Sequence, residues 1–436
     1  MMPHRAPAAD FARPGNEEND MAKPLGELDL YRLPWDEPSF AADPYPYIEA
    51  AREKHPWLAR TDTGHVVFEY QAIRDLLVQD DKFAPSFDGI VEIMGAEGTP
   101  WGRFTKEQMI NLPEREHALL RRTFATKFTP RYANQLRPLM RETMERLIAE
   151  WGPRGKIDFE EFSSYYPVAV TAQMIGAPLD AIPGLRQSME TMGLAFSLDP
   201  TRLPALNKAV DHMEAFCAGL IAERRKQPKA TEGQGDLLDM LLEASEEAGE
   251  GPDDEGGAIS QRKLLDLLIF LFVAGYDTSK NMLTLTMHLL IDRPDDYRRC
   301  GEDHAFARQV IEESFRYGST TSNQRILNED IAYRDVVLEK DAIVWFPLSI
   351  ATHDPRYADH ADRFDPEREQ KSPHIGFGLG AHICLGQYIA RAQIHEGLHL
   401  IAQRLRNPRT PGPQGYRPFP GTWGLRGLPI TFDAVG

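Results

Sequence analysis

The chain has 436 residues, of which 42% are hydrophobic and 26% charged, so it can bury a large core and is not a disordered protein. Its 49 lysines and arginines against 66 aspartates and glutamates give a net charge of −17, which excludes a general binder of nucleic-acid phosphates. Cys217, Cys300 and Cys384 have no C-x-x-C spacing, which excludes a disulfide framework and favours a reducing, cytoplasmic setting.

The beginning of the chain has mixed composition and lacks the hydrophobic segment of a signal peptide, so residues 1–24 are expected to form a flexible tail. No apolar run reaches the roughly 18 to 20 residues that a membrane-spanning helix needs. We therefore expect no membrane anchor. Because no repeat or long linker divides the remainder, residues 25–436 are predicted to form a single domain.

Helical periodicity dominates from about residue 44 onwards and is clear at 46–52 and 136–151, where apolar residues return every three or four positions. Strand signals are short. They lie at 65–70, 336–338 and 342–346, and the spacing of the last two predicts a hairpin.

An acidic, glycine-containing loop is expected at 244–257. The next helix is predicted to begin after the N-cap Ser260 and to end before Pro294. A helix of roughly 30 residues would be about 45 Å long and would cross the whole domain. The fold class predicted from these elements is mainly α with small β-sheets.

A glycine-rich stretch at 377–386 brings one cysteine to the start of an amphipathic helix at 387–404. Its glycines allow positive φ and a close approach to a flat ligand. Backbone N–H groups and the helix N-terminus are expected to lower the pKa of the Cys384 thiol, and a thiolate suits a soft metal ion. Cys384 is therefore the predicted metal ligand, whereas the other two cysteines read as small buried hydrophobic residues.

The same stretch, F-G-L-G-A-H-I-C-L-G, resembles the F-x-x-G-x-x-x-C-x-G signature of the cytochrome P-450 family of haem-thiolate monooxygenases. Three further motifs resemble those of the family and stand in its order: H-x-x-x-R at 117–121, A-G-x-[DE]-T at 274–278 and E-x-x-R at 313–316. The resemblance covers about residue 43 to the C-terminus. It implies a triangular helical body with haem between a long distal helix and the helix that follows the cysteine loop.

The resemblance implies haem b, iron protoporphyrin IX, with the Cys384 thiolate as axial ligand. Two of the implied cofactor contacts, His117 and Arg121, are spaced i, i+4, so one helical turn aims both at the haem propionates. The full set of implied cofactor contacts is His117, Arg121, Ala274, Gly275, Arg325, Phe377, Gly378, His382, Cys384 and Gly386. Glu313 and Arg316 are implied to be a buried structural pair that haem incorporation requires.

Asp277 and Thr278 are the implied catalytic pair, which would organise proton delivery to dioxygen. A glycine inside a helix costs about 1 kcal/mol relative to alanine, so Gly275 needs a packing or functional reason, and room above the iron supplies one. Thr278 is able to bond back to the carbonyl of residue 274, which loosens the helix. Lys280 stands where it can pair with Asp277 and alter the proton supply.

The implied reaction inserts one oxygen atom of O₂ into a C–H bond of a small apolar substrate, which is terpenoid, aromatic or steroid-like. Apolar residues of the connection before the 117–121 motif, with others nearer the C-terminus, are expected to shape the pocket. The candidates are Phe87, Met94, Trp101, Phe104, Phe196, Thr320, Thr321 and Phe419.

Little chain follows the helix at 387–404, so we expect the electrons to come from a separate ferredoxin with an NAD(P)H-dependent ferredoxin reductase, as in soluble bacterial members. The basic side chains predicted to dock the ferredoxin are Arg121, Arg122, Lys127 and Arg131. One alternative is a peroxygenase driven by H₂O₂, which would not need the acid and alcohol pair. Another is a haem-based carrier or sensor, because a fold does not fix a function.

Overall fold

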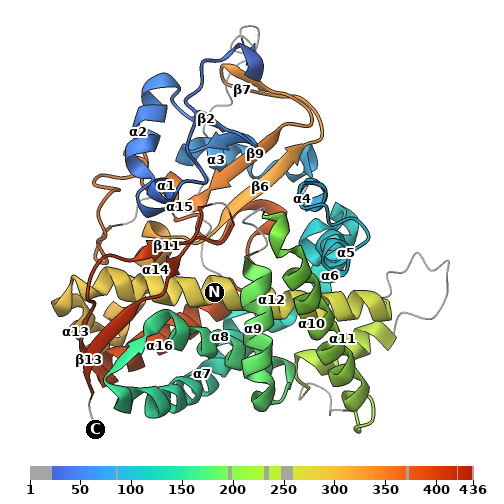
Figure 1. Ribbon diagram of the computed structural model, residues 1–436, viewed down its shortest axis with the longest axis vertical. Helices are drawn as coiled ribbons and strands as arrows, with labels where there is room; N and C mark the ends of the chain where they lie inside the picture. The colour runs from blue at the N-terminus through green and yellow to red at the C-terminus, as the bar shows by residue number, and fades with distance from the viewer. Residues whose placement is uncertain are drawn as a thin grey trace, which may run out of the picture.

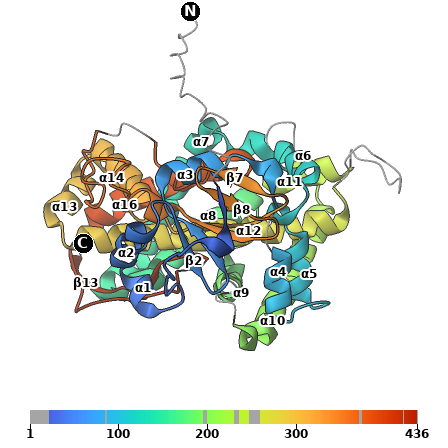
Figure 2. The ribbon, with the colours of Figure 1, turned by 90° about the horizontal axis from the view of Figure 1, so that it is seen from above.

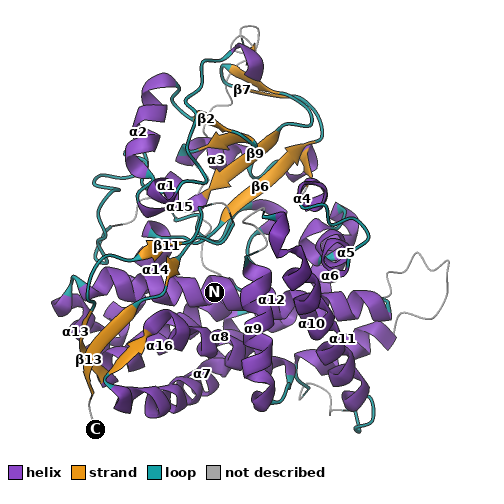
Figure 3. Ribbon diagram, in the orientation of Figure 1, coloured by secondary structure: helices purple, strands orange, loops and turns teal. Residues whose placement is uncertain are grey.

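The structure, a computed structural model, describes residues 22–84, 87–194, 199–229, 235–246, 259–369, 373–419 and 421–434. Helices form most of the body and the strands gather in small sheets (Figure 3), as the hydrophobic periodicity predicts. The outline is triangular, with helices along the base and the largest sheet toward the apex (Figure 1).

The helices, in chain order, are α1 (Pro38–Ala42), α2 (Tyr45–Lys54), α3 (Tyr70–Leu76), α4 (Phe87–Ile93), α5 (Pro100–Glu107), α6 (Glu114–Phe124), α7 (Pro130–Trp151), α8 (Phe159–Ile175), α9 (Ile182–Gly193), α10 (Leu203–Arg224), α11 (Leu237–Glu246), α12 (Gln261–Ile291), α13 (Pro294–Glu302), α14 (His304–Tyr317), α15 (Leu348–Ala351) and α16 (Gln387–Arg404). The strands are β1 (Lys23–Pro24), β2 (Leu58–Thr61), β3 (Gly64–Val67), β4 (Phe83–Ala84), β5 (Lys156–Asp158), β6 (Ser322–Leu327), β7 (Ile331–Tyr333), β8 (Val336–Leu338), β9 (Ile343–Pro347), β10 (Leu405–Arg409), β11 (Gly415–Tyr416), β12 (Leu425–Arg426) and β13 (Pro429–Ala434).

The largest sheet has the strand order β2-β3-β9-β6-β4, and β1-β8-β7, β10-β13-β5 and β11-β12 form the others. The predicted hairpin is wrong, because β8 pairs with β7, whereas β9 pairs with β3 and β6. The left-handed turn at Arg334 (φ 54°) joins β7 to β8 instead. The strand expected at 65–70 also ends early, since Tyr70 already begins α3.

Two predicted boundaries need correction: the end of the N-terminal tail and the start of the acidic loop. Lys23 and Pro24, expected in the tail, form β1 and pair with Val336 and Val337; residues 1–21 lie outside the described residues. Residues 244–246 of the predicted acidic loop end α11, and 247–257 lie outside the described part of the chain.

The long helix α12 starts and stops where the sequence predicts. The Ser260 hydroxyl accepts a hydrogen bond from the Lys263 N–H (3.1 Å) and so caps the helix, which ends three residues before Pro294. α12 crosses the whole body in Figure 1 and packs on α8, most of whose residues are buried. Seen from above, α4, α5 and α10 gather near one end of the molecule and α13, α14 and α16 near the other (Figure 2).

Three apolar clusters hold these layers together: one around α7, α8 and α16, one around α9, α10 and the first half of α12, and one under the largest sheet. Because burying a large apolar side chain stabilises the fold by roughly 1.5–3 kcal/mol, these clusters fix the positions of the helices that carry the motifs. Within the described residues, no helix is long and apolar enough to span a membrane.

Candidate active site

The cysteine loop folds back on itself immediately before α16. The Cys384 N–H donates to the Phe377 carbonyl (2.8 Å), and Gly378 and Gly380 adopt φ of 74° and 68°, which glycine tolerates best. A Cβ at position 380 would lie 3.0 Å from the Leu77 carbonyl, so the loop also needs glycine for its approach to the end of α3. The Cys384 side chain is half-buried at the end of this turn.

The electrostatic environment of the Cys384 sulfur contains opposing contributions. Burial raises the pKa of the thiol, and the N–H of Gly386 with the guanidiniums of Arg121 and Arg391 acts in the other direction. Burial wins, so the lowered pKa expected from the sequence is wrong for the protein chain alone. A bound metal ion supplies the positive charge that makes a coordinated thiol ionise.

Four basic side chains from three elements meet beside the cysteine loop. α6 contributes His117 and Arg121, β6 contributes Arg325, and the loop itself contributes His382. The His117 and His382 rings stack with centroids 4.2 Å apart, and Arg121 donates to the Ile383 carbonyl. The Nε2 atom of His117 is buried and has no hydrogen-bond partner among the described residues.

Burial lowers the pKa of each of these four groups, and that of His382 falls to about 3 with Arg325, His117 and Arg121 as further causes. Asp80 supplies opposing negative charge to His117 and Arg325. A buried basic cluster with so little negative charge is costly unless an anion completes it. It therefore fits a ligand with two carboxylates, such as the propionates of haem.

Small residues on α12 face open space. Ala274 is exposed, and Gly275 and Thr278 are half-buried, although Tyr276 and Asp277 beside them are buried. The Thr278 hydroxyl donates to the Ala274 carbonyl (3.0 Å), as the sequence predicts. Ala274, Gly275 and Thr278 therefore form the more accessible side of α12, and Tyr276 and Asp277 form its buried side.

Gly275 has a packing reason in the structure. A Cβ at this position would lie 3.1 Å from the Thr171 hydroxyl of α8. Close packing between α12 and α8 therefore already accounts for the glycine, apart from any room it leaves above a cofactor.

Asp277 turns its carboxylate into a buried ion cluster. Arg417 donates to both carboxylate oxygens (2.9 and 3.1 Å), and Lys280 Nζ lies 3.3 Å from one of them. The pair with Lys280 is the one that the sequence indicated. Arg417 was missed, because nothing in the 274–278 motif points to a residue so much later in the chain.

The E-x-x-R pair is buried and fully bonded. Arg316 donates to both carboxylate oxygens of Glu313 (2.8 and 2.6 Å), and its remaining N–H groups reach the carbonyls of Thr352, Ala361 and Arg363. One side chain thus ties α14 to the segment that precedes the cysteine loop.

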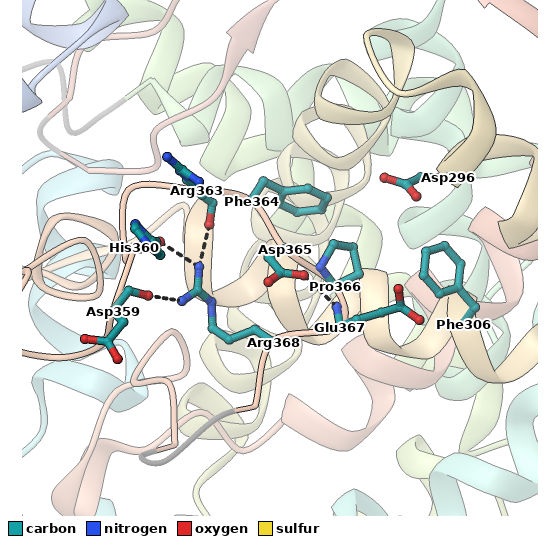
Figure 4. Close-up of a pocket in the computed structure, with 10 residues that line it drawn as sticks. All are labelled: Asp296, Phe306, Asp359, His360, Arg363, Phe364, Asp365, Pro366, Glu367 and Arg368. Atoms are coloured by element: carbon teal, nitrogen blue, oxygen red, sulfur yellow. Dashed lines mark hydrogen bonds between the residues drawn. The ribbon is translucent and has the colours of Figure 1, made fainter.

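Arg368 is a structural residue that the sequence analysis missed. Its Nε lies 3.6 Å from Glu313, and its other N–H groups donate to the carbonyls of Asp359, His360 and Arg363 (Figure 4). These residues line a surface cavity of about 330 Å³ with a polar wall. No residue of the cysteine loop or of α12 is among those that line it, so it is separate from the candidate active site.

Comparison with known proteins identifies this arrangement. A family model described as cytochrome P-450 matches residues 185–414, which is more than half of the chain. The chain belongs to the cytochrome P-450 family. It is 31% identical over 412 residues to the luteothin monooxygenase of Streptomyces thioluteus, covering 93% of this chain and 97% of that protein. It is 27% identical to the cytochrome P-450 monooxygenase PikC of Streptomyces venezuelae, covering 92% and 94%.

Solved structures agree on the fold. The crystal structure of CalO2 superimposes with a TM-score of 0.81 at 23% identity, covering 93% of this chain and all of that one. That of P450BioI in complex with an acyl carrier protein gives 0.78 at 23% identity and covers 91% and 100%. The protein is therefore an enzyme of the bacterial cytochrome P-450 monooxygenase family, and its family implies a haem-thiolate cofactor.

The predicted pocket residues of this cytochrome P-450 lie in different surroundings. Met94, Trp101 and Phe104 are buried in the apolar cluster of α9, α10 and α12, and Phe87 is half-buried against it. Phe196 lies outside the described residues. The described candidates from α4, α5 and the connection between them are therefore packed in or against one apolar cluster.

The C-terminal candidates divide in the same way. Thr320 is buried and Thr321 is half-buried where it bridges to Thr422, just before β6. Phe419 is 1% exposed and packs its ring on Trp35 and on Phe40, with centroid distances of 5.0 and 5.3 Å. Phe419 thus belongs to the aromatic core rather than to an open pocket wall, because its ring has no free surface.

The basic residues expected at a docking surface also divide. Arg122 and Arg131 are exposed, and Lys127 is half-buried and donates to the Gly235 carbonyl. Arg121 points inward to the cysteine loop. Only the first two present a guanidinium fully to solvent.

Proposed function

We propose that this protein is a haem-thiolate monooxygenase that inserts one oxygen atom of O₂ into a C–H bond of a small apolar substrate, with haem b held by Cys384. The observation that carries the proposal is the basic cluster beside the cysteine loop, in which His117 Nε2 is buried and has no partner among the described residues. Bound haem supplies the oxidant, and thiolate ligation favours O–O cleavage. In this proposal His117, Arg121, Arg325 and His382 donate to the propionates.

The loop and α12 would shape the two sides of the haem site. Phe377, Gly378 and Gly386 hold the turn that carries Cys384, and Ala274 and Gly275 leave the opposite helix without bulky side chains. The paired Glu313 and Arg316 keep the segment before the loop in place. Their role is structural, since neither side chain has a polar group left for a ligand.

Thr278 and Asp277 would move protons. The Thr278 hydroxyl donates to the Ala274 carbonyl, so its oxygen is left to accept a hydrogen bond from a water molecule on the accessible side of α12. When its carboxylate leaves Arg417, Asp277 would take up a proton from solvent and pass it to that water. In this proposal Thr278 positions the water that donates the proton, and Asp277 connects that water to the buried ion cluster.

The substrate is proposed to be small and apolar, of the terpenoid, aromatic or steroid-like class. Phe87, which is half-buried against the apolar cluster of α9, α10 and α12, supports this, because a polar substrate beside it would lose hydration without gaining partners. The similarity to luteothin monooxygenase adds luteothin to the candidates.

Electrons are proposed to come from a ferredoxin and an NAD(P)H-dependent reductase, with Arg122 and Arg131 at the docking surface. We further propose that residues 25–436 act as one domain and that the protein works in the cytoplasm. The free thiols Cys217 and Cys300, both buried and unpaired, support a reducing setting.

The deciding experiment is the reduced carbon monoxide spectrum of the purified protein, followed by titration of the ferric form with terpenoids, aromatics, steroids and luteothin. A thiolate-type spectrum and a low-to-high spin shift with one class are expected. A spectrum without thiolate character would contradict ligation by Cys384. Product formed with H₂O₂ alone would instead indicate a peroxygenase, and no product with either H₂O₂ or O₂ plus ferredoxin would indicate a carrier or sensor.

A further inference from the structure

The ion cluster around Asp277 draws side chains from four parts of the chain. Asp277 and Lys280 come from α12, Glu190 from α9, Glu160 from the first turn of α8, and Arg417 from the segment after β11. Lys280 is fully buried, and the side chains of Asp277 and Arg417 are only 6% and 7% exposed. The two cations and Asp277 are therefore internal, whereas Glu160 and Glu190, with side chains 17% and 33% exposed, lie at the edge of the cluster.

Each cation of the cluster is shared by the same three carboxylates. Arg417 donates to Asp277, to Glu190 (2.9 Å) and to Glu160 (3.2 Å). Lys280 lies 2.8 Å from Glu160, 3.2 Å from Glu190 and 3.3 Å from Asp277. Three carboxylates thus compete for two cations, and the cluster holds one negative charge in excess.

Glu190, the carboxylate on α9, is held in an orientation in which it contacts both cations. The Tyr276 hydroxyl donates to Glu190 (2.7 Å), which orients the acid toward α12. Arg186, also on α9, adds positive potential at Glu190 but bonds to the Ser164 hydroxyl. Burial opposes ionisation of Glu190, yet Lys280, Tyr276 and Arg417 together keep its pKa below the usual range, so it competes as a carboxylate.

α9 also touches Asp277 directly. A Cβ at Gly193 would lie 2.9 Å from the Asp277 carboxylate, so only a glycine permits this approach. Figure 1 shows α9 lying across α12 at this level. Any displacement of α9 would therefore change both the space around Asp277 and the charge that competes with it.

We propose that Glu190 is a positioning residue for proton delivery: it loosens Asp277 by competing with it for Arg417 and Lys280. Glu190 attracts the two cations, so Asp277 is held less tightly and its carboxylate is able to reach the proton route to Thr278. Removing Glu190 leaves Asp277 and Glu160 with one cation each, and Asp277 stays locked. This inference rests on the proposed role of Asp277. It implies that the position of α9 affects that role.

The competition is testable without turnover, through melting temperatures of the haem-loaded protein. Asp277→Asn in the native background leaves two carboxylates for two cations and should cost little. The same substitution in a Glu190→Gln background leaves Glu160 alone with two buried cations, so the loss in melting temperature should be clearly larger. Equal losses in the two backgrounds would overturn the proposal, because independent carboxylates would not compete.

Turnover tests the consequence. Glu190→Gln should lower product formed per NADH at least several-fold and enlarge the solvent isotope effect on NADH oxidation, while the substrate dissociation constant from the spin shift stays unchanged. Adding Lys280→Met restores one excess carboxylate and should recover the coupling. Glu214→Gln on α10 is the matched control, since Glu214 is also half-buried and paired with arginine outside this cluster.

The outcomes separate the two proposals. If Thr278→Ala leaves coupling intact but the melting cycle shows competition, the proton role fails and the positioning of Asp277 stands. If Glu190→Gln raises the substrate dissociation constant as much as it lowers coupling, or Lys280→Met gives no recovery, the residue acts on packing and the inference is wrong.

Discussion

His117 and His382 stack with ring centroids 4.2 Å apart, although one lies on α6 and the other on the cysteine loop. Burial lowers the pKa of both rings, that of His382 to about 3, and so favours their neutral forms. Arg121 and Arg325 lie beside them as the charged members of the cluster. The stacked pair therefore aligns neutral donors, while the two guanidiniums supply the charge for an anionic ligand.

Arg325→Leu should weaken haem retention more than any change at the exposed edge of α6. A hydrogen bond to a charged group is worth about 1.5–3 kcal/mol, which corresponds to roughly 10- to 100-fold faster haem loss. The rate of haem transfer to apomyoglobin measures this. Arg122→Leu, which removes an exposed arginine, is the control and should leave the rate unchanged; equal rates for both variants would contradict propionate binding by Arg325.

Glu313→Gln should prevent accumulation of folded, haem-containing protein. The substitution leaves the fully buried Arg316 with an uncompensated charge, and breaking such a pair costs about 3–5 kcal/mol. Arg316→Lys should fail similarly, because an ammonium group cannot replace a guanidinium that also serves three carbonyls. Haem content per milligram and melting temperature are the measurements. In the exposed pair Arg298 with Glu302, Glu302→Gln should change neither.

The parts of this site that the sequence could predict depend on short spacings. His117 and Arg121 share one helix face, Glu313 and Arg316 lie one turn apart, and the loop glycines stand next to Cys384. Each of these relations depends on residues only a few positions apart, so it can be read from the sequence pattern. Arg417 and Arg368 were missed because their partners are set by how distant segments pack, which no local period encodes.

The errors have the same origin. β8 and β9 were predicted to pair because they are close in sequence, but β9 pairs with β3 and β6, which are distant in sequence. Phe419 was assigned to the pocket from its place in the C-terminal turn and its apolar character, and that character suits a core equally well. Hydrophobicity predicts burial, but it does not distinguish a core from a cavity wall.

Thr278→Ala should uncouple oxygen use from product formation. The variant loses the hydroxyl that is proposed to position a water, so NADH would be consumed with peroxide released and product reduced by roughly tenfold or more. Peroxide and product are measured together per NADH. Thr286→Ala is the control. Thr286 makes the same type of bond, to the Met282 carbonyl on the same helix, but it is fully buried and does not lie on the accessible side of α12. If both variants remained coupled, the proton role of Thr278 would be wrong.

Arg122→Glu should slow reduction by a ferredoxin and weaken its dependence on salt. Exposed charges at a docking surface act mainly on the association rate and are screened over about 10 Å at 0.1 M salt. The rate of ferric reduction at several ionic strengths measures the effect. Arg298→Glu, which changes an equally exposed arginine on α13, serves as control. A wild-type rate that does not depend on salt would contradict electrostatic docking at this surface.

Asp266→Asn should flatten the dependence of stability on pH between about 4 and 6. Asp266 lies on α12 between Arg103 of α5 and Arg262, and burial raises its pKa from 3.8 to about 6, partly opposed by Arg103. The folded protein then holds a proton that the unfolded chain releases, so the native stability falls as pH rises through this window. After solvent screening the contribution is about 1–2 kcal/mol. Melting temperatures at pH 4.5 and 6.5 measure it, with the exposed Asp295→Asn as control; parallel pH profiles for wild type and Asp266→Asn would show that Asp266 titrates at its ordinary pKa.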